Sequence, residues 1–377
     1  DTDDWEESMC RALTAGRGIG RRLNLVIVAE GAQDLHGNPI TAEHVKEVLE
    51  ERLGEDTRVT SLGHVQRGGS PSAFDRYLST VLGYAAVEQV VASPGDEPQL
   101  IGIRGHQIIS SPLMDCVSKT RAVAEVIAEH DYDSAMAMRG GSFSDSFRMI
   151  RTMVRAHPHA PVPGGRRLRL AVLHAGGLAP GMNTAVRVAV RVGVDLGHTM
   201  LAVRNGFQGL ATGEIQEMDW MSVTGWVSRG GAELGTSRLI PTERGLGAIA
   251  AQLESHGIEG LLMVGGWSGY EAAHALHSQR DEYAALAIPI VCLPASINND
   301  LPRSELSIGA DTALNNIVAD VDKIKQSAVA SGRCFVVEVM GRDCGYLALM
   351  SGLATGAERV YRPEEGIALN DLAIDVE

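Results

Sequence analysis

Four segments of the chain share a pattern in which a run of apolar residues leads directly into a glycine-rich or polar loop. They cover residues 168–197, 260–276, 288–300 and 333–356. Their apolar runs, such as LRLAVLHA and GLLMVG, are nearly continuous rather than alternating, which is typical of strands buried on both faces. The sequence therefore predicts an α/β fold made of Rossmann-like three-layer lobes with mainly parallel sheets.

The first third of the chain also alternates predicted strands with predicted helices. Strands are predicted at the start of residues 21–34, at the start of residues 58–91 and over residues 99–109. Apolar residues at helical spacing predict helices over residues 40–54, the later part of 58–91, 114–140 and 142–156. The stretch HPHAPVPGGRR that follows is rich in Pro, Gly and Arg, and it is interpreted as a linker.

Charge and composition exclude several classes of protein. With 377 residues the chain is long enough for two or three domains of about 150 residues each. Its formal net charge of −14 opposes binding to nucleic acid, and no apolar run approaches the ~20 residues of a membrane span. The five cysteines form no CxxC pair, so neither a zinc site nor a disulfide framework is indicated. A cytoplasmic protein is therefore expected.

The two ends of the sequence suggest a piece of a longer protein. The chain starts with Asp1 rather than Met. It stops shortly after Asn370 and Asp371, either of which could cap a helix that the remaining residues do not complete. We therefore expect a fragment.

Glycines and basic residues gather where the predicted strands end, which is where ligands bind in open α/β sheets. The loop AGGLAPGMN, at residues 175–183, has the glycines that close approach to a phosphate requires. It matches neither GxGxxG nor GxxxxGK[ST]. Six basic residues lie in comparable loops or at strand ends: Arg58, His64, Arg67, Arg238, Arg333 and Arg342.

Arginines in such loops of an acidic protein indicate anion sites, because guanidinium binds phosphate through charge-assisted and often bidentate hydrogen bonds. For any single arginine a surface ion pair is an equal alternative, and a lone His64 is more often structural. A glycine loop by itself can be only a tight turn. The joint placement of these residues favours a ligand that carries phosphate.

Five motifs resemble the phosphofructokinase family: GHVQRGGSPSAFDR, AGGLAPGMNTAVR, LGTSR, GADTALN and VVEVMGRDCGYLAL. They resemble in particular the long eukaryotic-type form, in which two homologous halves are fused. The resemblance implies that residues 1–140 are the carboxyl-terminal part of a first, catalytic-type half. Residues 141–167 would be a connector, and residues 168–377 the amino-terminal part of a second, regulatory-type half. It also implies the phosphofructokinase-type fold.

The resemblance implies a 6-phosphofructokinase of glycolysis, which transfers a phosphoryl group from MgATP to fructose 6-phosphate and gives fructose 1,6-bisphosphate. The residues that match substrate-binding positions of the family are Glu30, Arg58, His64, Val65, Gln66 and Arg67. Those that match sugar-phosphate positions in the second half are Arg238, Ser296, Ile297, Asn298, Asn299, Asp300, Arg333, Met340, Gly341 and Arg342. Gly177 resembles the glycine at the nucleotide phosphates.

Two departures from the family pattern change the expectation for the second half. Trp267 stands where the family has the aspartate that binds Mg²⁺, and Asn298 stands where it has the catalytic base. A carboxamide cannot accept the substrate proton, and an indole cannot bind magnesium. Asp300 and Asp343 are more readily explained as residues that orient loops or arginines. We therefore expect the second half to be an allosteric site for a phosphosugar, with Mg²⁺ bound in a part of the first half that precedes this chain.

The sequence leaves one other function open and argues against a second. A non-catalytic regulatory subunit that binds sugar phosphates stays open, because the metal and base positions of the first half are not in this sequence. A nicotinamide-dependent oxidoreductase would need GxGxxG and an acidic residue about 20 positions later, and neither is found. The resemblance of Arg58 and Arg333 to residues that reach across a subunit interface predicts a homo-oligomer of the tetramer type. The identity of the phosphoryl donor in the catalytic half stays open.

Overall fold

The computed structural model describes residues 4–21, 23–92, 97–105 and 107–366, in two compact units. The first unit comprises residues 1–70 and 90–159, and the second comprises residues 71–89 and 160–377. The helix start predicted at Asn370 or Asp371 lies outside the described residues. Within the described ranges, no helix is long and apolar enough to cross a membrane.

Helices dominate the first unit. The elements in chain order are α1 (Trp5–Gly18), α2 (Ala42–Leu53), the 3-10 helix η1 (Gly63–Arg67), strands β1 (Gln99–Arg104) and β2 (Gln107–Pro112), α4 (Leu113–Ala128), α5 (Tyr132–Met138) and α6 (Gly141–Met153). The Thr41 side chain accepts a hydrogen bond from the His44 amide at the start of α2, and Gly54 ends that helix with φ of 65°. Residues Cys10, Val45, Val48 and Leu49 form the core between α1 and α2.

Three strand predictions for the first unit were wrong. The apolar run within residues 21–34 pairs with no strand among the described residues, and Ile27 is 87% exposed. Residues 58–62 are likewise outside any strand. Residues 99–109 do not form one strand but most of an antiparallel hairpin, which turns at Gly105 with φ of 54°. A strand is held by hydrogen bonds to its neighbour, so an apolar run without one stays irregular.

The second unit contains the predicted parallel sheet. Its strands are β3 (Arg169–Ala175), β4 (Thr199–Val203), β5 (Ile215–Met218), β6 (Gly260–Gly265) and β7 (Ile290–Pro294). Their order is β5-β4-β3-β6-β7, and every neighbouring pair is parallel except β4 and β5. Strand β3, which opens the series predicted from residue 168, is the central strand. The expected α/β fold is confirmed.

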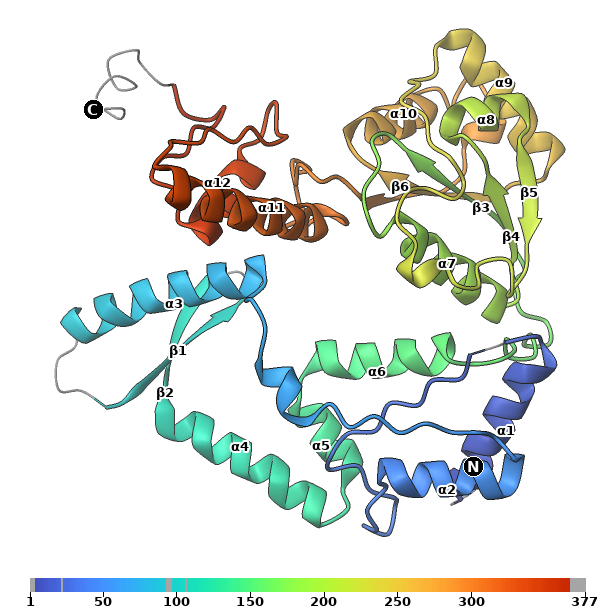
Figure 1. Ribbon diagram of the computed structural model, residues 1–377. Coiled ribbons are helices and arrows are strands. Elements are labelled where there is room, and N and C mark those ends of the chain that lie inside the picture. The colour runs from blue at the N-terminus through green and yellow to red at the C-terminus, as the bar shows by residue number, and fades with distance from the viewer. Residues whose placement is uncertain (1–3, 22, 93–96, 106, 367–377) are drawn as a thin grey trace. The chain divides into compact units, whose positions relative to one another are not determined.

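Helices cover both faces of this sheet (Figure 1). On one face lie α8 (Gly206–Thr212), α9 (Glu243–Ser255), α10 (Trp267–Ser278) and the 3-10 helix η3 (Ala284–Leu286), with buried Phe207, Ile249 and Leu276. On the other face lie α7 (Met182–Asp195) and the 3-10 helix η2 (Trp226–Ser228), with buried Val186 and Trp226. The arrangement is the predicted three-layer lobe.

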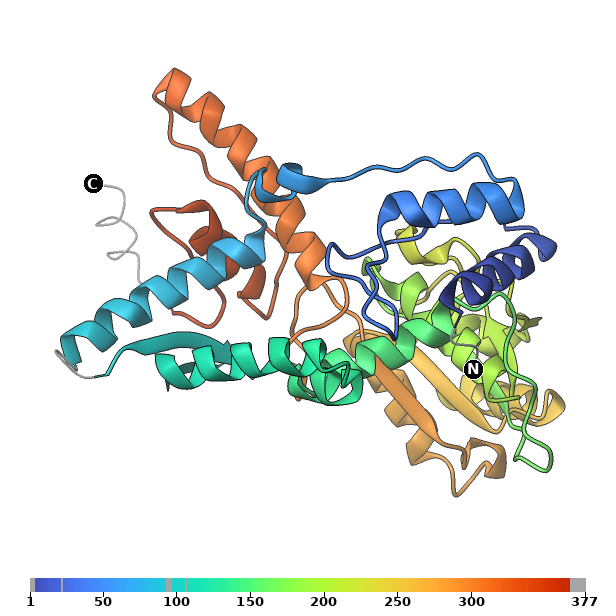
Figure 2. The same ribbon diagram turned by 90° about the horizontal axis from the view of Figure 1, so that it is seen from below.

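A separate helical group completes the second unit. It contains α11 (Ala310–Ser331), α12 (Tyr346–Thr355) and most of α3 (Ala73–Ala92), whose last three residues belong to the first unit; the ribbons of the three helices can be followed in Figure 2. The helices share a small core of Ala73, Leu314, Val318, Leu347 and Ala354. The strand predicted at the start of residues 333–356 was wrong, since residues 333–339 are irregular and Val336 is 95% exposed. No strand among the described residues lies beside this run.

Candidate functional site

The carboxyl ends of β3, β6 and β7 lie side by side, and each leads into one of the predicted loops. Gly176 follows β3 with φ of +93°, and a Cβ built on it would lie 3.0 Å from Oγ of Ser268 on α10. A Cβ on Gly266, after β6, would lie 3.6 Å from Cβ of Ser296. The glycines therefore let three loops approach closely at one edge of the sheet.

The loop after β3 packs closely against Ile308 at its end, where α7 begins. A Cβ on Gly181, whose φ is +107°, would lie 2.7 Å from Cγ2 of Ile308. Gly181 is also the N-cap of α7, and no side chain caps that helix. The Met182 amide donates to Ala179 O at 3.2 Å, and no side chain accepts a hydrogen bond from the amides that follow it, which suits this helix start to an anion.

Arg238 lies over this glycine loop. Its Nη2 atom is 3.5 Å from the position that a Gly177 Cβ would occupy, so the structure brings these two predicted site residues together. The segment before Arg238 is anchored to the same loop, because Gly176 N donates to Ser237 O at 2.8 Å and Thr236 Oγ1 donates to Gly176 O at 2.9 Å. These hydrogen bonds hold the backbone before Arg238 against the glycine loop.

Asn299 shapes the loop after β7. It has φ of 54°, its Oδ1 accepts from the Ser307 amide at 2.7 Å, and its Nδ2 donates to Glu305 O at 3.1 Å. Ser296 Oγ donates to Asp300 Oδ1 at 2.9 Å, so Asp300 orients the loop as its sequence context suggested. The Oδ1 atom of Asn298 is buried and accepts no hydrogen bond from any described residue.

The segment that carries Met340, Gly341 and Arg342 contacts this loop through Cys344, whose Sγ lies 3.9 Å from Asn299 O. Met340, Arg342 and Arg333 are exposed. The structure thus brings the 340–342 segment beside residues 296–300, whereas no hydrogen bond or ion pair ties the Arg333 side chain to either group within the described residues.

The charged groups near these loops are mostly unpaired. Among the described residues, the guanidinium groups of Arg67, Arg238, Arg333 and Arg342 form no ion pair. Arg58 does pair, with Asp56 at 3.3 Å, but both side chains are at least 80% exposed. For Arg58 the structure therefore supports the alternative of a surface ion pair, and such a pair is worth little.

The substrate-type residues of the first unit are exposed and separate. Glu30 lies in a turn after the irregular run, and His64, Val65, Gln66 and Arg67 lie in η1. Within the described part of the unit, no hydrogen bond or ion pair joins Glu30, Arg58 and η1 to one another. The structure thus keeps the predicted arginine and histidine side chains available but does not assemble them.

The donor set at Trp267 does not fit a magnesium ion. Trp267 begins α10 directly after the β6 loop, and its side chain is 55% exposed. Magnesium takes oxygen ligands in an octahedral arrangement, which an indole cannot provide. In the described part of the chain, no three His, Cys, Asp or Glu side chains gather in a way that could hold a metal.

Sequence reasoning missed Ser268 and His174, which lie against or just before the glycine loop. Ser268 directly follows Trp267, the residue that replaces the metal-binding aspartate of the family, so this position next to a predicted site residue was the available signal. His174 is fully buried on β3, close to backbone groups of Met182 and Gly235. Burial lowers the pKa of its ring, and the interactions with these backbone groups oppose that shift only in part.

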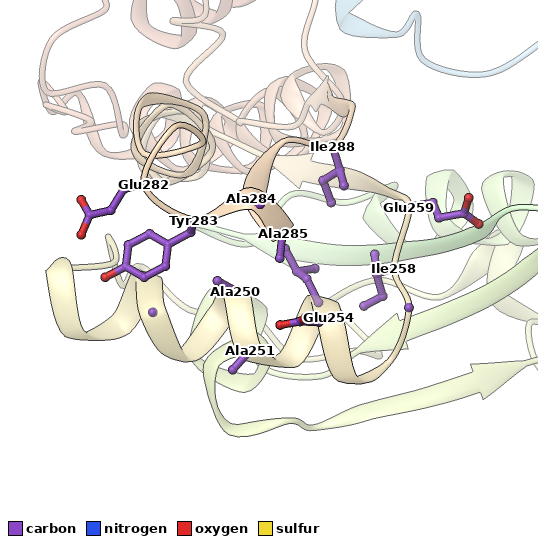
Figure 3. Close-up of a pocket in the computed structure, with 13 residues that line it drawn as sticks. Ala250, Ala251, Glu254, Ile258, Glu259, Glu282, Tyr283, Ala284, Ala285 and Ile288 are labelled. Atoms are coloured by element: carbon purple, nitrogen blue, oxygen red, sulfur yellow. The ribbon is translucent and has the colours of Figure 1, made fainter.

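A pocket of about 580 Å³ lies at the opposite edge of the sheet, between α9 and the chain that leads to η3 (Figure 3). Ile258 and Ile288 line it just before β6 and β7 begin, so it is remote from the carboxyl ends of these strands. Its carboxylates, Glu254, Glu259 and Glu282, would repel a phosphate. We therefore place the candidate site at the loops and not in this pocket.

A three-layer lobe whose strand-end loops are rich in glycine, with Arg238 beside one of them, is typical of α/β proteins that bind phosphorylated ligands. The chain belongs to the phosphofructokinase family, since the sequence profile of that family, described as Phosphofructokinase, matches residues 3–90 and 169–377. This confirms the resemblance seen in the motifs.

Individual relatives agree with this assignment. The chain is 47% identical over 379 residues to ATP-dependent 6-phosphofructokinase of Dictyostelium discoideum, a match that covers all of this chain and 45% of the relative. It is 45% identical to the muscle-type enzyme of Equus caballus, covering 48% of that protein. The crystal structure of Pichia pastoris phosphofructokinase in the T-state matches with 40% identity and a TM-score of 0.94, over 99% of this chain and 40% of that chain. The chain thus spans about half the length of its curated relatives.

Proposed function

We propose that this chain is part of an ATP-dependent 6-phosphofructokinase, which transfers a phosphoryl group from MgATP to fructose 6-phosphate and yields fructose 1,6-bisphosphate. One observation carries the proposal beyond family membership: Arg67, Arg238, Arg333 and Arg342 have no carboxylate partner within the described residues, although the chain is acidic. A guanidinium without a carboxylate partner is suited to a phosphate group.

Residues 1–140 would bind the substrate fructose 6-phosphate. His64 and Arg67 of η1 would bind the phosphate of fructose 6-phosphate, with Val65 and Gln66 between them, while Glu30 would accept hydrogen bonds from the sugar hydroxyls. Each of these side chains is exposed, as binding from solvent requires. Arg58, which pairs with the exposed Asp56, can exchange that partner for a phosphate at little cost.

The second part would bind a phosphosugar without turning it over. Arg238 and the amides near Gly177 would face one phosphate, and Arg333 with the 340–342 segment would bind another. The loop of Ser296, Ile297, Asn298, Asn299 and Asp300 would contact the sugar between them. Asn298 cannot remove a proton and Trp267 cannot hold Mg²⁺, so we propose an allosteric site here. Mg²⁺, which neutralises charge on the nucleotide phosphates when bound, would be held elsewhere in the protein.

The remaining expectations stay proposals on the same basis. Residues 1–140, 141–167 and 168–377 would be the end of a catalytic-type half, a connector and the start of a regulatory-type half. The partners would be fructose 6-phosphate, ATP and a phosphosugar effector, in a cytoplasmic homotetramer. The alternative, a regulatory subunit without activity, is decided by the first experiment.

The test uses the natural protein that contains this sequence. A coupled assay with fructose 6-phosphate and MgATP should detect fructose 1,6-bisphosphate, and a protein without turnover would instead support the regulatory subunit. Calorimetry should detect a fructose bisphosphate in addition. An Arg333→Ala variant should weaken that binding by about tenfold or more, since a charged hydrogen bond contributes roughly 1.5–3 kcal/mol. Unchanged affinity would remove Arg333 from the site, and Lys323→Gln on the exposed face of α11 serves as the control.

A further inference from the structure

Asn183, the second residue of α7, is fully buried, and its side chain holds a loop of the same lobe. Its Nδ2 atom donates to the carbonyl oxygens of Arg229 and Gly230, at 3.1 and 3.0 Å, and its Oδ1 atom accepts from the Glu233 amide at 2.8 Å. Carbonyl groups only accept and a backbone amide only donates, so these contacts fix the orientation of the Asn183 side chain. The first turn of α7 is thereby joined to residues 229–233.

These contacts bind the backbone of the loop and not its side chains. The side chains of Arg229 and Glu233 are exposed and pair with each other at 3.3 Å. Thr184, the next residue of α7, adds a hydrogen bond from its Oγ1 atom to the carbonyl oxygen of Val227 at 3.0 Å. The path of the loop is therefore set by the start of α7 and does not depend on what the loop side chains bind.

The chain that carries Arg238 is bound to both ends of the glycine loop, residues 175–183. At one end the Gly176 amide donates to the carbonyl oxygen of Ser237, the residue before Arg238. At the other end Asn183 holds the backbone that leads toward Arg238. The glycine loop and the Arg238 segment thus form a closed frame.

The middle of the Arg238 segment is equally constrained. The carbonyl oxygen of Leu234 accepts from the Asn205 amide at 2.7 Å, and the Leu234 side chain is buried. Gly235 has φ of 69°, and a Cβ built on it would clash with Oδ1 of Asn205. Close-packed segments transmit a displacement instead of absorbing it, so a shift at residues 229–233 should reach Arg238.

We infer that Asn183 is a positioning residue for the proposed phosphate site: its side chain holds Arg238 beside the start of α7, so that the guanidinium and the first α7 amides bind one phosphate together. The inference rests on the proposed function of this site. The Asn183 side chain is fully buried and acts only through the backbone that it holds. Donors that are placed in advance bind an anion without the entropic cost of ordering them, which favours affinity.

The experiment measures by calorimetry the Kd of the natural protein for fructose 2,6-bisphosphate, a sugar with two phosphates that is not the reaction product. Asn183→Asp keeps the size of the side chain but replaces both N–H donors with a carboxylate oxygen, which repels the carbonyl groups of Arg229 and Gly230. It should weaken binding by about tenfold, as should Arg238→Ala, which removes a charged hydrogen bond. In the Arg238→Ala background, Asn183→Asp should change the Kd by less than about twofold, because the side chain that it positions is absent.

Two further variants separate positioning from stability. Ile249→Ala opens a cavity in the core on the other face of the sheet, so it should lower the thermal midpoint and keep the Kd. Thr184→Val removes only the hydrogen bond to Val227, and it provides the test where Asn183→Asp does not fold. It should weaken binding by about twofold or more, and it should have no effect in the Arg238→Ala background.

Four results would overturn the inference. An unchanged Kd in folded Asn183→Asp, or in Thr184→Val where Asn183→Asp does not fold, would show that the start of α7 does not position Arg238, while the site itself would stand. A further loss of affinity in the Arg238→Ala background would give Asn183 a role independent of Arg238. An equal loss in Ile249→Ala would reduce the effect to one of stability. An unchanged Kd in Arg238→Ala would refute the proposed function of this site, and the inference would fall with it.

Discussion

Replacing each of two adjacent glycines with alanine should have opposite effects on stability. Gly176 is buried with φ of +93°, and an added Cβ would lie 3.0 Å from Ser268 Oγ and 3.5 Å from the Gly266 amide nitrogen. Gly177 is exposed, its φ lies outside the region that disfavours L residues, and an added Cβ would meet only Arg238 Nη2 at 3.5 Å, an ordinary contact.

The magnitudes follow from these two environments. Gly176→Ala places a side chain in left-handed backbone, which costs about 1–2 kcal/mol before the close contact with Ser268 is relieved. Gly177→Ala fits its native backbone and restricts the unfolded chain, which stabilises a protein by about 0.4–1 kcal/mol. The free energies of unfolding of the two variants should therefore differ by roughly 2 kcal/mol, with Gly176→Ala the less stable.

Urea unfolding followed by tryptophan fluorescence measures this difference, because Trp220, Trp226 and Trp267 lie in the same lobe. Phosphosugar titrations of the folded variants complete the test. The Gly177 methyl group would lie between the loop backbone and Arg238, so Gly177→Ala should weaken phosphosugar binding although the fold is intact. Equal stability of the two variants would refute the structural reasoning, and full phosphosugar affinity of Gly177→Ala would refute the place of the site.

Two further predictions concern the loop of η1 and the buried histidine. Arg67→Ala in the natural protein should raise the KM for fructose 6-phosphate by about tenfold or more and leave that for ATP unchanged, since a charged hydrogen bond contributes roughly 1.5–3 kcal/mol; equal changes in both constants would exclude Arg67 from the sugar site. Burial lowers the pKa of His174, so below about pH 6.5 the unfolded chain binds a proton more readily than the folded chain does. The free energy of unfolding should therefore decrease as the pH falls. Unfolding between pH 7 and pH 5 should show this loss, which His174→Leu should reduce; an unchanged slope would contradict the assignment.

Several features of the fold were predictable from local sequence. The runs LRLAVLHA and GLLMVG are apolar at nearly every position, and a strand of that kind is stable only between two helical layers. Both form interior strands of the sheet, β3 and β6. Thr41 and Gly54 stand at the two ends of α2 for local reasons of hydrogen bonding and backbone freedom. The loops of Gly177 and Ser296–Asp300 could be located because they directly follow such strands.

Local sequence could not decide which apolar runs become strands. Residues 23–28 and 335–337 read like LRLAVLHA, yet both are irregular here, because a strand needs a neighbour whose backbone hydrogen bonds it shares. Nor could sequence tell which arginines are free. Arg58 has a carboxylate two residues away and pairs with it, whereas Arg238 comes close to Gly177 only after the sheet has assembled.

By itself the sequence determined the family and the buried strands β3 and β6, since each is a property of residue type and spacing. Only the tertiary structure decided which side chains far apart in the sequence become partners. Arg76 and Asp322 are 246 positions apart, and no periodicity or motif relates them. They meet because α3 and α11 bury Ala73 against Leu314 and Val318, and burial of apolar surface selects such contacts without regard to distance along the chain.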